Sequence, residues 1–139
     1  WEHWDGMKDD GSMWSADMNS FNHYAYGAIG EWMYRAMAGI EADPEHPGFK
    51  HAILYPRIGG NLKYTAGKYH SIYGDVGVKW EVQGKQITLT VQIPVNTTAE
   101  IRLDQAKSVL ESDGLTFIRE ADYMAAEAGS GTYQIVFEQ

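Results

Sequence analysis

The sequence predicts a mainly β protein, an antiparallel β-sandwich preceded by a loop and one long α-helix. Two observations carry this prediction. From about Pro47 onward, apolar and polar residues alternate in short runs separated by glycine-rich turns, which is typical of strands with one buried face. Before Pro47, one segment repeats its apolar residues every three or four positions, as an amphipathic helix does. We therefore expect a boundary between residues 1–46 and residues 47–139.

Length, charge and composition exclude several classes of protein. The chain has 139 residues, the size of one domain, and a net charge of −8 from 11 Lys and Arg against 19 Asp and Glu. Nucleic-acid-binding proteins usually present a basic face, so no nucleic-acid partner is expected. There is no apolar run of about 18 residues, so no membrane partner is expected either. The absence of cysteine excludes disulfides and thiolate metal sites and leaves the compartment open.

The N-terminal segment is predicted to be a loop. Residues 1–18 combine glycine, serine and aspartate, and their apolar residues show neither a sustained helical period nor a sustained strand period. Their Asp9-Asp10-Gly11 order lacks the alternating oxygen ligands of a calcium loop. The chain opens on Trp1 rather than on methionine, so we expect it to be a piece of a longer protein.

The helix is predicted from Ser20 to Ala38. Asn19 or Ser20 can cap its first turn, and Gly39, followed by Pro44, supplies its stop. The apolar residues that set its period are Phe21, Tyr24, Ala25, Ala28, Ile29, Trp32, Met33, Ala36 and Met37.

The strands follow in order. His51–Arg57 is an apolar run, and Leu62–Tyr73 is an extended tyrosine-rich stretch. A hairpin is predicted next, because alternating residues over 76–82 and 87–93 flank the turn Gln83-Gly84-Lys85. Further strands are expected at 99–103, 107–111 and 132–137. Residues 118–128 have helix-forming Ala and Glu, but their position between strands favours a strand.

Two sequence patterns that resemble ligand-binding sites are better explained as ordinary structural features. Gly129-Ser130-Gly131-Thr132 resembles a phosphate loop, but no helix follows it, so a hairpin turn is expected. The histidines His3, His46, His51 and His70 have no mutual metal-ligand spacing. We therefore predict no metal site and no cofactor.

The candidate site residues lie near the N-terminus. Glu2 stands between Trp1 and Trp4, whose indoles can stack on a sugar and restrict water around the carboxylate. Such desolvation raises the pKa of Glu2 towards a useful general base. His23 lies near the helix start, where the dipole favours a neutral ring that can donate to and accept from sugar hydroxyls. On the residues alone, a solvated loop acid and a structural histidine remain open alternatives.

Four segments of the chain resemble the C-terminal part of bacterial α-L-rhamnosidases. The resemblance runs to the last strand, and the Asn22-His23-Tyr24-Ala25-Tyr26-Gly27 portion is its most specific piece. The four segments are Trp1–Asp5, Asn19–Gly27, Pro47–His51 and Ile93–Ala99.

The resemblance implies an (α/α)6 catalytic barrel followed by a β-sandwich. Residues 1–46 would be the end of the barrel. The family hydrolyses terminal α-L-rhamnosyl groups with inversion, which makes a rhamnose-containing carbohydrate the expected substrate. By resemblance, Glu2 matches the general base and His23 a sugar-contacting residue, with Trp1 and Trp4 as expected sugar contacts. The general acid lies upstream, so the remainder of the barrel is the expected partner and the isolated chain is expected to be inactive.

Two other classes of function stay open. One is a non-catalytic carbohydrate-binding or structural β-sandwich, and the other is a different (α/α)6 glycosidase or phosphorylase with the same trailing sandwich. An acidic motif in the upstream barrel would favour hydrolysis over a binding module.

Overall fold

A computed structural model of the chain describes residues 6–15, 17 and 27–139. Its backbone groups into two compact units, residues 1–31 and residues 32–139. In the described part of the first unit, Met7 and Met13 form an isolated antiparallel bridge. The N–H of Lys8 donates to the carbonyl of Ser12 at 2.8 Å, which closes a turn between them. The described residues here thus have the turn and loop structure that the sequence predicts.

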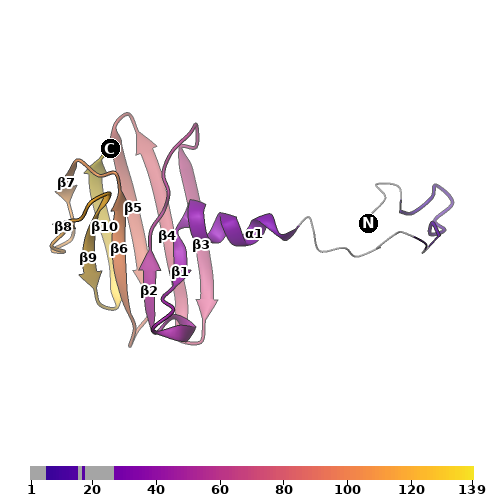
Figure 1. Ribbon diagram of the computed structural model, residues 1–139, viewed down its shortest axis with the longest axis horizontal. Coiled ribbons are helices and arrows are strands. Elements are labelled where there is room, and N and C mark those ends of the chain that lie inside the picture. Colours follow the sequence, from indigo (N-terminus) through magenta and orange to yellow (C-terminus); the bar gives the residue numbers. More distant parts are fainter. Residues whose placement is uncertain (1–5, 16, 18–26) are drawn as a thin grey trace. The chain divides into compact units, whose positions relative to one another are not determined.

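The second unit is a β-sandwich of two five-stranded sheets within residues 32–139, all of which the structure describes (Figure 1). The first sheet has the strand order β1-β2-β6-β9-β8, and the second has the order β3-β4-β5-β10-β7. The bounds are β1 (Ile40–Ala42), β2 (His51–Leu54), β3 (Tyr64–Ser71), β4 (Gly74–Gln83), β5 (Gln86–Ile93), β6 (Thr98–Asp104), β7 (Ser108–Glu111), β8 (Ile118–Arg119), β9 (Tyr123–Ala128) and β10 (Gly131–Glu138). The mainly β prediction is therefore confirmed.

One pair of strands departs from the otherwise antiparallel pairing of the sandwich. Strands β2 and β6 pair in parallel, with His51 opposite Thr98 and Leu54 opposite Ile101. After β2 the chain crosses to the second sheet, builds β3, β4 and β5 there, and returns to the first sheet as β6. A parallel pair needs such a long crossover, and the local residue pattern carries no signal for it.

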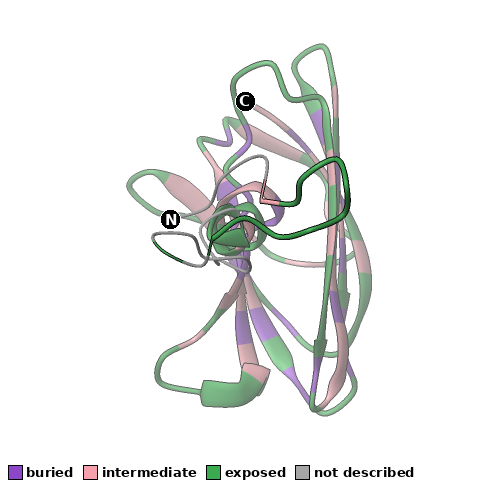
Figure 2. Ribbon diagram, turned by 90° about the vertical axis from the view of Figure 1, so that its right-hand side faces the viewer, coloured by how far each residue is buried: buried purple, intermediate pink, exposed green. Residues whose placement is uncertain are grey.

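The core forms because the strand period is two. Along β4, Val76, Val78 and Trp80 are buried, while Lys79 and Glu81 are exposed. The predicted hairpin is present, with Gln83 opposite Gln86 across the turn at Gly84, whose φ of 65° suits glycine. Buried positions lie on strands of both sheets (Figure 2). The largest fully buried side chains are Trp80, Phe137, Leu54, Ile87, Leu89, Ile101, Leu103 and Ile135.

The described part of the predicted helix comprises α1 (Ile29–Trp32) and the wider π-helical segment η2 (Met33–Ala38). The expected start at Ser20 lies outside the described residues. The predicted stop is confirmed, because Gly39 adopts a left-handed conformation (φ 74°) and donates its N–H to the carbonyl of Tyr34. No helix among the described residues is long and apolar enough to span a bilayer.

The end of η2 is fixed to the sandwich by three hydrogen bonds. The indole N–H of Trp80 donates to the carbonyl of Met37 at 2.8 Å. The N–H groups of Tyr55 and Arg57 donate to the carbonyls of Gly39 and Ala36 at 2.7 and 2.8 Å. Strand β1 continues from this point and pairs with β2, so residues before Pro47 contribute to the first sheet. The proposed division between residues 46 and 47 stays a prediction.

Candidate functional site

The residues predicted to act on the sugar, Trp1, Glu2, Trp4 and His23, all lie outside the described residues. Their roles stay predictions. Described residues that could contact a ligand or another protein lie on α1 and η2 and on the outer faces of the two sheets.

The helix presents apolar side chains to solvent. Met33 and Tyr34, with Met37 and Ala38, line a hollow of about 430 Å³ against residues 65–68 of β3. Gly67 allows this close approach, because a Cβ there would lie 2.6 Å from the Cβ of Ala38. The exposed fractions of the four large apolar side chains are Ile29 57%, Trp32 53%, Met33 46% and Tyr34 46%. Such a row of apolar residues is a surface suited to contact with another protein element.

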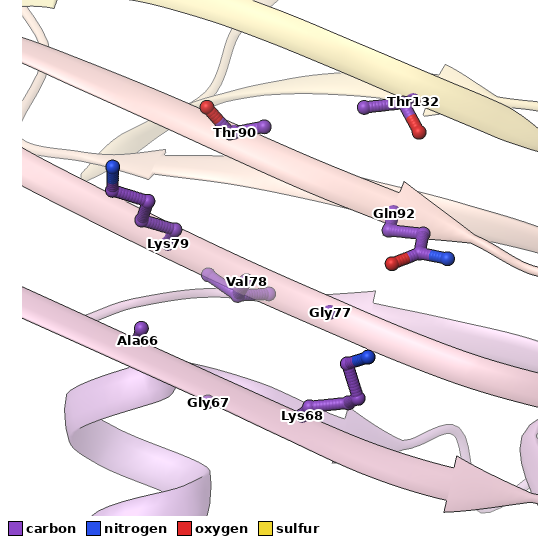
Figure 3. A pocket seen from close by; sticks show the side chains of 9 residues that line it. All are labelled: Ala66, Gly67, Lys68, Gly77, Val78, Lys79, Thr90, Gln92 and Thr132. Atoms are coloured by element: carbon purple, nitrogen blue, oxygen red, sulfur yellow. The ribbon is translucent and has the colours of Figure 1, made fainter.

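A second hollow, of about 330 Å³, lies on the outer face of the second sheet around Gly77 (Figure 3). Gly77 has no side chain, and a Cβ there would lie 3.3 Å from the Cβ of Gln92. The side chains of Lys68, Lys79 and Gln92 rise around this gap (Figure 3). A glycine inside an alternating strand is the sequence signal for such a gap.

The hollow at Gly77 has groups that can bind a sugar, but it has no carboxyl group for glycoside hydrolysis. Its polar groups are two ammonium groups, an amide and the hydroxyls of Thr90 and Thr132, all of which can hydrogen-bond a sugar hydroxyl. No residue that lines it is a carboxylate, and glycoside hydrolysis uses two carboxyl groups. If hydrolysis involves this chain, the carboxylate has to come from elsewhere.

Asp75 lies on β4 two residues before Gly77, and its hydrogen bonds favour its ionised form. Its Oδ1 accepts from Nδ1 of His70 at 2.8 Å, and its Oδ2 accepts from Nζ of Lys68 at 2.9 Å. The bond from His70, followed by that from Lys68, lowers the pKa of Asp75 below its usual value. A carboxyl with a lowered pKa is unsuited to act as a general acid.

His46, before β2, and His51, the first residue of β2, have their rings in contact. The rings of His46 and His51 are 5.6 Å apart, centroid to centroid, in an edge arrangement. Nδ1 of His46 lies 2.6 Å from Oδ2 of Asp43, and this bond lowers the pKa of Asp43. Nδ1 of His51 lies 2.7 Å from Oγ1 of Thr98. Each ring therefore has a local hydrogen-bonding partner, and no metal-binding group of three His, Cys, Asp or Glu residues occurs within the described ranges.

Two family models match consecutive parts of the chain. Residues 1–37 match the bacterial alpha-L-rhamnosidase six-hairpin glycosidase domain, and residues 39–116 match the bacterial alpha-L-rhamnosidase C-terminal domain. The second match covers more than half of the chain.

Individual relatives agree with these matches. A curated alpha-L-rhamnosidase of Streptomyces avermitilis is 39% identical over 137 residues, which cover 96% of this chain and 13% of that protein. The crystal structure of an S. avermitilis alpha-L-rhamnosidase complexed with L-rhamnose is 37% identical, with a TM-score of 0.78 over 98% of this chain and 13% of that one. The structure of the Dictyoglumus thermophilum enzyme is 26% identical, with a TM-score of 0.79 over 100% of this chain and 16% of that one. The chain thus spans a small fraction of the length of the relatives it matches.

Proposed function

The chain belongs to the bacterial α-L-rhamnosidases, and from this membership we propose that it forms the C-terminal part of an enzyme that removes terminal α-L-rhamnosyl groups from rhamnose-containing glycans or glycosides. The observation that carries the proposal is the order of the two matches, a glycosidase domain followed at once by a C-terminal domain of the same enzyme. In this proposal residues 1–46 complete the (α/α)6 barrel, with β1 of this segment also joining the first sheet, and residues 47–139 form the rest of the sandwich.

The proposed reaction is hydrolysis with inversion, and Glu2 is its general base. An inverting enzyme needs two carboxyl groups about 6.5–9.5 Å apart, so that a water fits between the base and the anomeric carbon. Glu2 would remove a proton from this water while a carboxylic acid of the upstream barrel protonates the leaving oxygen. The indoles of Trp1 and Trp4 would limit hydration of Glu2 and raise its pKa.

His23 is proposed to hold the sugar. A neutral imidazole has one donor and one acceptor nitrogen, which suits neighbouring hydroxyl groups on one ring. Trp1 and Trp4 would stack on the apolar face of the sugar, which in rhamnose carries a methyl group.

The exposed apolar side chains of α1 and η2 support the proposal that this helix packs inside a larger barrel. Ile29, Trp32, Met33 and Tyr34 are each about half exposed, although apolar residues recur along this helix every three or four positions, as in a buried stripe. A barrel helix has neighbours that would cover these side chains.

The hollow at Gly77 favours a second candidate function, that of a carbohydrate-binding module. Its hydroxyl, amide and ammonium groups can bind sugar hydroxyls, and it contains no catalytic carboxylate. This candidate predicts sugar binding by the isolated chain without any hydrolysis.

The test is hydrolysis of p-nitrophenyl α-L-rhamnoside by a protein of full family length that carries this sequence. We expect release of p-nitrophenol, with β-L-rhamnose as the first product anomer in proton NMR. The isolated 139-residue chain is expected to release none. An α-anomer as the first product would contradict the inverting mechanism, and turnover by the isolated chain would contradict the need for an upstream acid.

A further inference from the structure

A third hollow, of about 710 Å³, lies on the first sheet at the end of the sandwich where Gln139 contacts Asp104. It is formed where β2 and β6 end and where β9 begins. We call it the Arg–Tyr hollow. Its residues are Tyr55, Arg57, Arg102, Asp104, Gln105, Ala106, Lys107, Arg119, Ala121, Asp122 and Tyr123.

The Arg–Tyr hollow is positively charged in a chain whose net charge is −8. Four cationic side chains line it, against the two carboxylates of Asp104 and Asp122. Arg57 is paired with Asp104 at 3.2 Å, and Arg102 is paired with Glu100 at 2.5 Å. The other two cations, Lys107 and Arg119, have no carboxylate within ion-pairing distance among the residues that the structure describes. The hollow therefore has cations left over for a ligand's negative charge.

Two tyrosines hold the arginines in place. The rings of Tyr55 and Tyr123 are 5.3 Å apart. The guanidinium carbon of Arg57 lies 3.4 Å from the centroid of Tyr55, and that of Arg102 lies 5.1 Å from the centroid of Tyr123. A planar guanidinium stacked on a ring keeps its edge free to bind oxygen atoms. Such stacking places donors at fixed positions around the hollow.

The loops of the hollow are also fixed by hydrogen bonds. Nη2 of Arg119 donates to the carbonyls of Ala106 and Lys107, both at 2.9 Å. The side-chain amide of Gln139 donates to the carbonyl of Asp104 at 2.8 Å. A site that is ordered before binding loses less conformational entropy when a ligand arrives.

Asp104 gives the hollow an acceptor beside its cations. Its Oδ1 accepts from the hydroxyl of Tyr55 and from Nη1 of Arg57, each at 3.2 Å. Burial is the main cause that raises the pKa of Tyr55, which keeps this hydroxyl protonated as a donor. Oδ2 of Asp104 has no hydrogen bond to any described residue. An acceptor next to cations suits a ligand that brings hydroxyl groups together with one negative charge.

We propose that the Arg–Tyr hollow binds an acidic sugar residue, a ring with one carboxylate and several hydroxyls. Lys107 and the free edge of Arg57 would bind the carboxylate, and Asp104 would accept from a hydroxyl. A sulfate has no hydroxyl for Asp104 and carries more charge for it to repel. The proposal rests on the proposed function in one respect, that the parent enzyme acts on glycans, and it adds that those glycans contain uronic acids.

The test is a titration of the ¹⁵N-labelled 139-residue chain with trigalacturonate, followed by amide chemical shifts. We expect saturable shifts at residues 102–107 and 119–123 that weaken with added salt. Lys107→Gln is expected to weaken binding about fivefold, the effect of losing one solvent-exposed ion pair. Lys63→Gln, at an exposed lysine just before β3 of the other sheet, is the matched control and should bind as the unchanged chain does.

Three comparison ligands decide what is recognised. Methyl α-L-rhamnoside and sodium sulfate at equal ionic strength should leave these amides unshifted, and a hexaglutamate peptide should bind more weakly than trigalacturonate. Equal shifts with sulfate or with the peptide would overturn the proposal in favour of a general anion site. Absence of shifts with trigalacturonate, or shifts located only at other residues, would also overturn it. The probe contains no rhamnose, so failure here leaves the rhamnosidase test unaffected.

Discussion

Gly39 connects the helix to the sandwich, and its backbone and its surroundings both require glycine. Its φ is 74°, and a Cβ at this position would lie 2.0 Å from the nitrogen of Pro56. Neither a rotamer change nor a small shift of a flexible side chain can relieve this overlap, because the neighbouring atoms belong to the backbone. The sequence pattern predicts the left-handed helix stop, whereas the contact with Pro56 is visible only in the fold.

We predict that Gly39→Ala lowers the free energy of unfolding by about 3 kcal/mol or more, since it combines backbone strain with a steric clash. Gly84→Ala is the control, because Gly84 has a similar φ of 65° but no atom within 4 Å of a Cβ. That change is expected to cost about 1 kcal/mol, from strain alone. Urea unfolding followed by tryptophan fluorescence measures both. Equal losses would show that Pro56 can move away from residue 39.

At the scale of the elements, the strands are the part that sequence predicts well. The alternation over β4 and β5 and the glycine at their turn specify the hairpin locally. Residues 118–128 form two strands, β8 and β9, as their position between strands indicated and against the helix propensity of alanine. The parallel pairing of β2 with β6 could not be predicted, because it depends on a crossover that brings residues about 47 positions apart into register.

The attachment of η2 to the sandwich gives an element-scale prediction. Trp80→Phe removes the indole N–H that donates to the carbonyl of Met37 and leaves the ring volume mostly filled. We expect a loss of about 1–3 kcal/mol in stability and faster amide exchange at Tyr55 and Arg57, whose N–H groups bond to the same end of the helix.

Trp32→Phe is the matched control, since Trp32 is 53% exposed, and it should leave exchange at Tyr55 and Arg57 unchanged. Unchanged exchange in Trp80→Phe as well would mean that the indole bond does not hold η2 to the sheets.

At the scale of the whole molecule, the exposed apolar row on α1 and η2 predicts how the isolated chain behaves. We expect the 139-residue chain to self-associate or to bind a hydrophobic dye, because Ile29, Trp32, Met33 and Tyr34 remain uncovered. Trp32→Lys should reduce both effects. Ile72→Lys, at a turn residue that is 85% exposed and outside this row, should not. Light scattering and dye fluorescence measure the outcome, and a monomeric chain that does not bind the dye would contradict it.

The two candidate sites differ in how far the sequence could predict them. Glu2 and His23 are close to other characteristic residues in sequence, so a local pattern was enough to propose them. The Arg–Tyr hollow unites residues from 55 to 123, which meet only after the sandwich has formed. No local pattern signals a site whose parts come from the segment after β2, the end of β6 and the start of β9.

The most direct test of the account is the turnover of Glu2→Gln in a protein of full family length that carries this sequence. Glutamine keeps the size of the side chain but cannot remove a proton from water, so kcat for p-nitrophenyl α-L-rhamnoside should fall at least about a hundredfold with a modest change in KM. Glu45→Gln, at an exposed residue in the turn before η3 (Pro47–Phe49), should keep normal turnover. Near-normal kcat in Glu2→Gln would contradict the proposal that this chain supplies the general base.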